Sequence, residues 1–104
     1  MKFEIVYRHE DMSQALRTYT EEQLTGIERF GEEFEEGEVI FESVHGRVSC
    51  EAILRRRKGE PFIASDTMDD ARQALDSVIG KLERQFLKFK DKHSAKARRH
   101  RAND

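Results

Sequence analysis

Four short segments of the chain alternate between apolar and polar residues, or are briefly apolar, which is typical of strands with one buried face. Between the last three, His45-Gly46 and Gly59 are turn signals. Pro61 cannot donate to a ladder, so it marks the start or the edge of a strand. The expected strands are residues 2–8, 38–44, 47–56 and 62–65.

Apolar residues at steps of three and four predict a first helix between the first two strands. Ser13 is the expected N-cap, because its hydroxyl can accept a hydrogen bond from a free first-turn amide. The pattern runs through Phe30 and ends at Gly31. The acidic stretch GEEFEEG, residues 31–37, is then interpreted as a connection.

The clearest periodicity predicts a second helix from about residue 68 to about residue 92. Thr67 is the expected N-cap, and Asp69 and Asp70 would lie in the first turn, near the positive end of the helix dipole. Residues 93–104 lack an apolar pattern, so we expect a basic, flexible tail there. The apolar positions of this helix are Met68, Ala71, Leu75, Val78, Leu82, Phe86 and Phe89.

The order β-α-β-β-β-α predicts an α+β fold, in which a four-stranded mixed sheet has both helices packed on one face. The first two strands flank a helical crossover and should be parallel, whereas short turns should make the later strands antiparallel. One domain is expected over residues 1–92. The residues expected to meet the helices are Phe3, Ile5, Val39, Phe41, Val48, Ala52 and Leu54.

Charge changes the picture. The chain has 104 residues, of which 38% are charged, against about 25% in an average soluble protein. The net charge of −2 hides a division, since residues 1–50 carry −7 and residues 51–104 carry +5. Residues 81–101 alone hold 9 basic and 2 acidic side chains. Such asymmetry favours a polyanionic partner.

Several classes of protein are disfavoured. No stretch approaches the roughly 18 apolar residues of a membrane span, and the start of the chain lacks the apolar region of a signal peptide. Cys50 is the only cysteine, which excludes an internal disulfide and favours a cytoplasmic protein. The four histidines are too scattered for a metal site, and no phosphate-binding loop occurs. We therefore expect no catalytic residues, metal, cofactor, small-molecule substrate or membrane partner.

The second helix carries a candidate RNA-binding surface. With 100° per residue, four cations fall on one flank beside the buried face, and Lys90 is the exception on the other flank. A stripe of this length can follow several phosphates, although a solvated helix face is the plain alternative. Three arginines at the expected turn before Gly59 add positive charge. The candidates are Lys81, Arg84, Lys88 and Lys92, then Lys90, Arg55, Arg56 and Arg57.

At these residues the chain resembles a known family. The opening KFEIVYRHEDMSQALRTYTEEQL and the helix DTMDDARQALDSVIGKLERQFLKFKDK are similar to the ribosome hibernation-promoting factors, also called ribosome-associated translation inhibitors. The resemblance covers about residues 1–92. Its most specific positions are Asp66, Met68, Ala74, Asp76, Lys81-Leu82, Gln85 and Lys88, with Ser13, Ala15 and Leu16 at the start of the first helix.

The resemblance implies a non-catalytic inhibitor of translation. Such factors bind the small ribosomal subunit against the rRNA of the decoding channel, where they block the mRNA and tRNA sites. It also implies that the cations of the last helix contact phosphates and do not read bases. The short chain favours a monomer away from the ribosome.

One departure from the family keeps alternatives open. The exposed side of the first helix is usually rich in lysine, whereas here it reads Glu21-Glu22-Gln23. An acidic first helix suits a basic protein, so a protein-interaction module of the same fold is a second hypothesis. A general binder of double-stranded RNA is a third.

Overall fold

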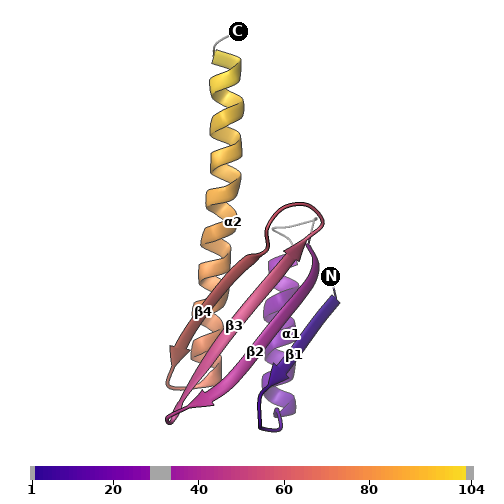
Figure 1. Ribbon diagram of the computed structural model, residues 1–104, viewed down its shortest axis with the longest axis vertical. Coiled ribbons are helices and arrows are strands. Elements are labelled where there is room, and N and C mark those ends of the chain that lie inside the picture. Colours follow the sequence, from indigo (N-terminus) through magenta and orange to yellow (C-terminus); the bar gives the residue numbers. More distant parts are fainter. Residues whose placement is uncertain (1, 29–33, 103–104) are drawn as a thin grey trace.

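The computed structural model describes the backbone of residues 2–28 and 34–102, and the side chains of residues 2–28 and 34–90. The strands lie in the order β1-β2-β3-β4, with β1 parallel to β2 and the other neighbours antiparallel. Both helices pack on one face of this sheet (Figure 1), which confirms the expected fold. The elements are β1 (Lys2–Tyr7), α1 (Gln14–Glu28), β2 (Phe34–Val44), β3 (Arg47–Arg56), β4 (Phe62–Met68) and α2 (Ala71–Ala102).

Tight turns join the antiparallel strands at opposite ends of the sheet. Between β2 and β3, His45 has φ 51° and Gly46 has φ 79°, and two consecutive residues with positive φ are what a type I′ hairpin turn requires. Between β3 and β4, Gly59 has φ 97°. Both turns lie where the sequence predicts them.

The N-cap predicted for α1 is confirmed. Ser13 Oγ accepts a hydrogen bond from Leu16 N at 3.1 Å, and Ser13 O accepts one from Arg17 N at 3.0 Å. Thr20 is fully buried, and its hydroxyl donates to Leu16 O at 2.8 Å, so the burial leaves no polar group unsatisfied. The buried side of α1 consists of Leu16, Thr20, Leu24 and Ile27.

The start of β2 differs from the sequence prediction, which treated residues 31–37 as a connection. β2 already begins at Phe34, which is only 8% exposed and lies opposite Arg56. The acidic residues fit a strand because their carboxylates remain at the surface while Phe34 and Gly37 are buried. Residues 31–33, including the predicted helix end at Gly31, lie outside the described residues.

The predicted start of α2 and its predicted cap at Thr67 are wrong. Thr67 and Met68 belong to β4 and pair with β3. The helix begins at Ala71, and Asp70 is the cap, because its Oδ1 accepts a hydrogen bond from Gln73 N at 2.9 Å. The strand therefore runs three residues further than the predicted end at residue 65, and the helix starts accordingly later.

The predicted end of α2 near residue 92 is also wrong, since the helix continues to Ala102 and includes most of the segment expected to be a flexible tail. Residues 93–102 contain neither glycine nor proline and are rich in Ala, Lys and Arg, which favour helices. Extending a helix that has already formed costs little, so no apolar stripe is needed. The last part of α2 extends beyond the sheet (Figure 1).

The core lies between the sheet and the helices. Val39, Phe41 and Ala52 are fully buried, and Leu75 and Val78 of α2 pack in the same cluster. Phe3, Ile5 and Val48 are partly buried against it, as the alternation predicts. Cys50 is 1% exposed, and burial raises the pKa of its thiol to about 12, in agreement with a structural role.

We expect Asp70→Ala to destabilise the protein by about 1 kcal/mol, because it removes the side-chain acceptor at the start of α2. Asp69→Ala is the matched control, since Asp69 is highly exposed and forms only a surface ion pair with Arg47. Urea unfolding of both variants measures the difference. Equal stabilities would show that Asp70 is not the cap.

Candidate nucleic-acid interface

A polar ridge of α2 fastens this helix to the free edge of β4. Lys81 Nζ donates to Ser65 O at 2.9 Å, and Gln85 Nε2 donates to Ile63 O at 2.8 Å. Ser77, Lys81 and Gln85 are spaced four residues apart and therefore project from one side of the helix. β4 is an edge strand, so these contacts satisfy carbonyl groups that no other strand can reach.

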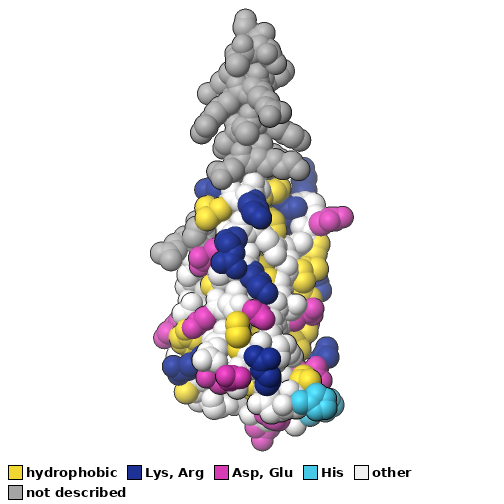
Figure 2. Space-filling view, turned by 90° about the vertical axis from the view of Figure 1, so that its left-hand side faces the viewer, with side chains coloured by type: hydrophobic (Ala, Val, Ile, Leu, Met, Phe, Trp, Pro, Cys, Tyr) yellow, Lys and Arg dark blue, Asp and Glu magenta, His cyan; other side chains and the backbone are white. Residues whose placement is uncertain are grey.

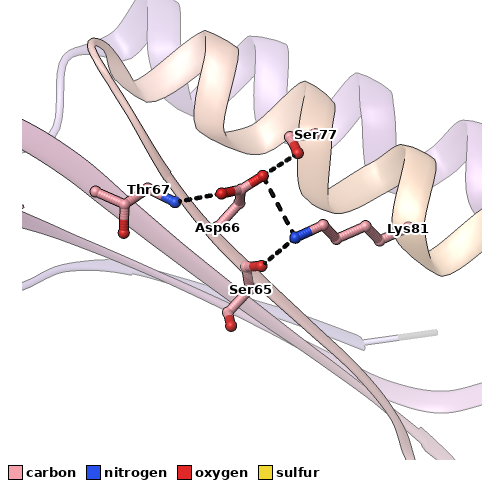
Figure 3. A network of polar contacts seen from close by, with 5 residues as sticks. All are labelled: Ser65, Asp66, Thr67, Ser77 and Lys81. Atoms are coloured by element: carbon pink, nitrogen blue, oxygen red, sulfur yellow. Dashed lines mark hydrogen bonds and ion pairs between the residues drawn. The ribbon is translucent and has the colours of Figure 1, made fainter.

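Asp66 connects the same strand to the same ridge (Figure 3). Its Oδ1 accepts a hydrogen bond from Thr67 N at 2.8 Å, and its Oδ2 accepts one from Ser77 Oγ. Lys81 Nζ lies 3.4 Å from Oδ2. The hydrogen bond from Ser77, then that from Thr67, and the nearby Lys81 hold the pKa of Asp66 below its usual range. Lys81, predicted as a phosphate ligand, is thus occupied in holding α2 to the sheet.

The next cations along α2 are exposed. Arg84 and Lys88 lie on the same flank of the helix as Lys81, and neither forms an ion pair among the described residues. Figure 2 shows a file of Lys and Arg side chains on this side of the molecule, with acidic side chains mainly lower down. Lys90 is exposed and lies 5.6 Å from the centroid of the Phe86 ring. The side chain of Lys92 lies outside the described residues.

The structure separates the three arginines at the end of β3. Arg55 lies on the sheet face away from the helices, where it pairs with Glu38 of β2 at 3.4 Å. Arg57 follows the strand and pairs with Glu35 at 3.3 Å, although its side chain remains 78% exposed. Arg55 and Arg56 point in opposite directions because adjacent residues of a strand lie on opposite faces of the sheet.

Arg56 points towards α2 and joins the β3–β4 turn to that helix. Its guanidinium carbon lies 4.8 Å from the ring centroids of both Phe62 and Phe89. Its Nε donates to Glu60 O at 2.8 Å. The positive φ of Gly59 favours glycine at this position, and an added Cβ would also meet the guanidinium of Arg56 and displace it. Arg56 therefore positions the turn and is not itself a free cation.

Two features of this surface escaped the sequence prediction. Lys58, next to Gly59 in the turn, is exposed and forms no ion pair among the described residues. The run Arg55-Arg56-Arg57-Lys58 predicts a basic turn, but the candidate site included only its three arginines. The second feature is the anchoring role of Lys81. The four-residue spacing of Ser77, Lys81 and Gln85 indicates that they share one side of the helix, but it does not show which strand that side contacts.

The arrangement suits the binding of a polyanion. Exposed Arg84 and Lys88 on α2, with Lys58 in the turn, supply positive charge next to elements that Lys81, Gln85 and Arg56 anchor. Within residues 2–28 and 34–90, no group of three His, Cys, Asp or Glu side chains is placed to hold a metal ion. Over the described part of the chain, no helix has the length and apolarity to cross a bilayer.

Comparison with known families gives one match over most of the chain. The family described as "Sigma 54 modulation protein / S30EA ribosomal protein" matches residues 3–94. This range includes α1, β2, β3 and β4 in full, β1 from Phe3 onwards, and α2 as far as Ser94.

Individual relatives agree with this match. A ribosome hibernation promoting factor from Azotobacter vinelandii is 32% identical over 82 residues, which are 79% of this chain and 76% of that protein. A protein of the same name from Pseudomonas putida is 30% identical over 95 residues, 91% of this chain and 92% of that protein.

Solved structures are similar as well. A ribosomal subunit interface protein from Coxiella burnetii superposes with a TM-score of 0.80 at 27% identity, covering 88% of this chain and 99% of that one. The N-terminal domain of Protein Y from Thermus thermophilus gives 0.76 at 20% identity, covering 86% and 99%, which shows the shared fold.

Asp66 predicts a pH dependence of stability. Folding lowers the pKa of Asp66 below the value of about 4 that an aspartate has in the unfolded chain. The ionised carboxylate therefore stabilises the fold fully above that pH, and this contribution is lost as the pH falls through the lower pKa of the folded protein. We expect Asp66→Asn to lower the melting temperature at pH 7 and to differ less from wild type as the pH approaches 2. Asp11→Asn, at an exposed residue, is the control. A difference independent of pH would contradict this role.

Arg56 predicts a second effect on stability. Arg56→Ala removes two cation–π contacts and one hydrogen bond, so we expect a loss of about 1–2 kcal/mol in urea unfolding. Arg57→Ala, which removes only an exposed ion pair, should cost less than about 0.5 kcal/mol. If the two variants unfold alike, the turn is not held by Arg56.

Proposed function

The chain belongs to the family of Sigma 54 modulation proteins and S30EA ribosomal proteins, and we propose that it is a ribosome hibernation factor that binds the small ribosomal subunit and inhibits translation. The names of its relatives support hibernation and a position at the subunit interface. On this proposal the protein contacts rRNA in the decoding channel and occupies space that mRNA and tRNA need. It acts in the cytoplasm without catalysis and is a monomer when free.

The observation that carries this proposal is that two exposed cations of α2 form no ion pair among the described residues. Arg84 and Lys88 are exposed on the same flank of α2 as Lys81, and Figure 2 shows a file of Lys and Arg side chains on this side of the molecule. Beyond them, the helix backbone continues to Ala102 through a segment with Lys96, Arg98, Arg99 and Arg101. Exposed cations on one flank of a helix, as at Arg84 and Lys88, suit contact with successive phosphates.

The first helix supports a binding mode centred on α2. Glu21 and Glu22 are exposed on α1, and Arg17 is only partly exposed. Carboxylates repel phosphates, so α1 adds no electrostatic attraction to rRNA. The proposed contact therefore uses α2 and the β3–β4 turn, where Lys58 extends the positive surface. In this arrangement Arg56 holds the turn, and Arg55 and Arg57 are paired with glutamates of β2. Arg84 and Lys88 make the main phosphate contacts, with Lys92 as the next candidate along the helix and Lys90 on its other flank.

Charge reversal on α2 tests this proposal. We expect Arg84→Glu/Lys88→Glu to weaken binding to purified small subunits by at least about tenfold. The slope of log affinity against log salt concentration should fall by about 1.5, because two phosphate contacts are lost. Co-sedimentation across a salt series measures both quantities. Inhibition of translation in a reconstituted system should weaken in parallel.

Arg8→Glu/Arg47→Glu is the matched control, with the same change in charge. Both residues are exposed and form surface ion pairs near the end of the sheet opposite the β3–β4 turn. Binding of this control should stay close to wild type. The proposal would be wrong if wild-type protein did not sediment with small subunits at low salt. An equal loss in both double variants would remove Arg84 and Lys88 from the account.

A further inference from the structure

One acidic residue contacts the basic flank of α2. Asp66 has 26% of its side chain exposed, and its Oδ2 lies 3.4 Å from Lys81 Nζ. A carboxylate repels the phosphates that Arg84 and Lys88 of the same flank are proposed to bind. By charge alone, Asp66 should therefore weaken the binding of a polyanion, both directly and by neutralising Lys81.

The contacts of Asp66 indicate a different role (Figure 3). The carboxylate accepts hydrogen bonds from Thr67 N in its own strand and from Ser77 Oγ in α2, so it joins β4 to the helix. Lys81 strengthens the same junction, because its ammonium group lies between Asp66 Oδ2 and Ser65 O, to which it donates at 2.9 Å. Leaving this position would cost the ammonium group two acceptors.

The junction holds α2 at one rotation about its axis. Ser77, Lys81 and Gln85 contact β4 or its side chains over eight residues of helix, which is about 12 Å. At 100° per residue, Lys88 lies about 20° and Arg84 about 60° around the axis from Lys81. A rotation of about 20° moves a group that lies about 6 Å from the axis by about 2 Å. Such a shift is enough to break a hydrogen bond to a phosphate.

We propose that Asp66 and Ser77 are positioning residues for the contact with rRNA, because they hold α2 at the rotation in which Arg84 and Lys88 meet successive phosphates. The inference rests on the proposed function. In this account an acidic residue strengthens the binding of a polyanion, since the alignment of two cations outweighs the repulsion that one carboxylate adds. Lys81 belongs to the anchor and is not a phosphate ligand.

The competing account is purely electrostatic. If Lys81 contacts phosphate, as the family resemblance implies for the cations of this helix, then Asp66 competes with RNA for its ammonium group. Removing the carboxylate would then free Lys81 and strengthen binding. The two accounts therefore predict opposite signs for the same substitution.

The affinity of Asp66→Asn for purified small subunits tests the sign. We expect binding about five- to tenfold weaker than that of wild type, because α2 is less well aligned before it binds. The slope of log affinity against log salt concentration should stay near wild type, since every cation remains. Co-sedimentation is measured across a salt series, at a temperature at which circular dichroism shows each variant to be folded.

Asp70→Ala is the matched control. It also removes one carboxylate and weakens the start of α2, but it leaves the contacts of Lys81 and Gln85 with β4 in place. Its affinity should stay near wild type. Ser77→Ala changes no charge and should weaken binding as Asp66→Asn does, whereas Ser77→Thr keeps the hydroxyl group and should bind more tightly than Ser77→Ala.

A double-mutant cycle tests whether Asp66 acts through the two cations. In the Arg84→Gln/Lys88→Gln background, Asp66→Asn should change the affinity by less than about twofold, because no cation of the pair is left to align. Single substitutions separate anchor from ligand. Lys88→Met should lower the salt slope by about 0.9, whereas Lys81→Met should leave the slope near wild type.

Three results would overturn this inference alone, with wild-type protein bound to small subunits at low salt. The first is an affinity of Asp66→Asn equal to or above that of wild type. The second is an equal loss in Asp70→Ala, which would indicate general destabilisation. The third is a fall of the salt slope in Lys81→Met as large as in Lys88→Met. Wild-type protein that did not sediment with small subunits would overturn the proposed function and this inference together.

Discussion

The attachment of α2 to the edge of β4 is the contact on which the rest of the arrangement depends. The buried stripe of α2 sets the helix on the sheet, and hydrogen bonds from Lys81 and Gln85 to two particular carbonyl groups favour one rotation and one register. Asp66 reinforces the same position through Ser77. The rotation of α2 then determines that Arg84 and Lys88 face solvent. The same contact shields one edge of the sheet and leaves β1 as the other.

The charge division along the sequence is partly cancelled in space. The glutamates at the start of β2 face the arginines at the end of β3, so Glu35 and Glu38 neutralise Arg57 and Arg55. Exposed pairs of this kind contribute little to stability. Their effect is to remove charge from the sheet face and to leave the positive surface on α2 and at Lys58. The acidic stretch is therefore part of the sheet and not a repulsive tail.

The sequence predicted the order of elements because alternation and helical spacing are local signals. It placed the cap of α2 incorrectly because Thr67 and Asp70 are both good capping residues, and only the ladder between β3 and β4 decides between them. The basic flank of α2 was predicted from angles alone. That Lys81 is anchored, and that Arg55 and Arg56 lie on opposite faces, depends on strand register, which a single sequence does not reveal.

Cys50 lies where the two layers of the molecule meet, with 1% of its surface exposed and a thiol that stays protonated at neutral pH. An alkylating reagent reaches this sulfur only when the helices separate from the sheet, and it reacts fully only when the thiol regains an ordinary pKa. The rate of alkylation is therefore a measure of how often the folded molecule opens. The native thiol of Cys50 thus reports the rate at which the helices separate from the sheet, and any ligand that restrains the helices should slow its alkylation.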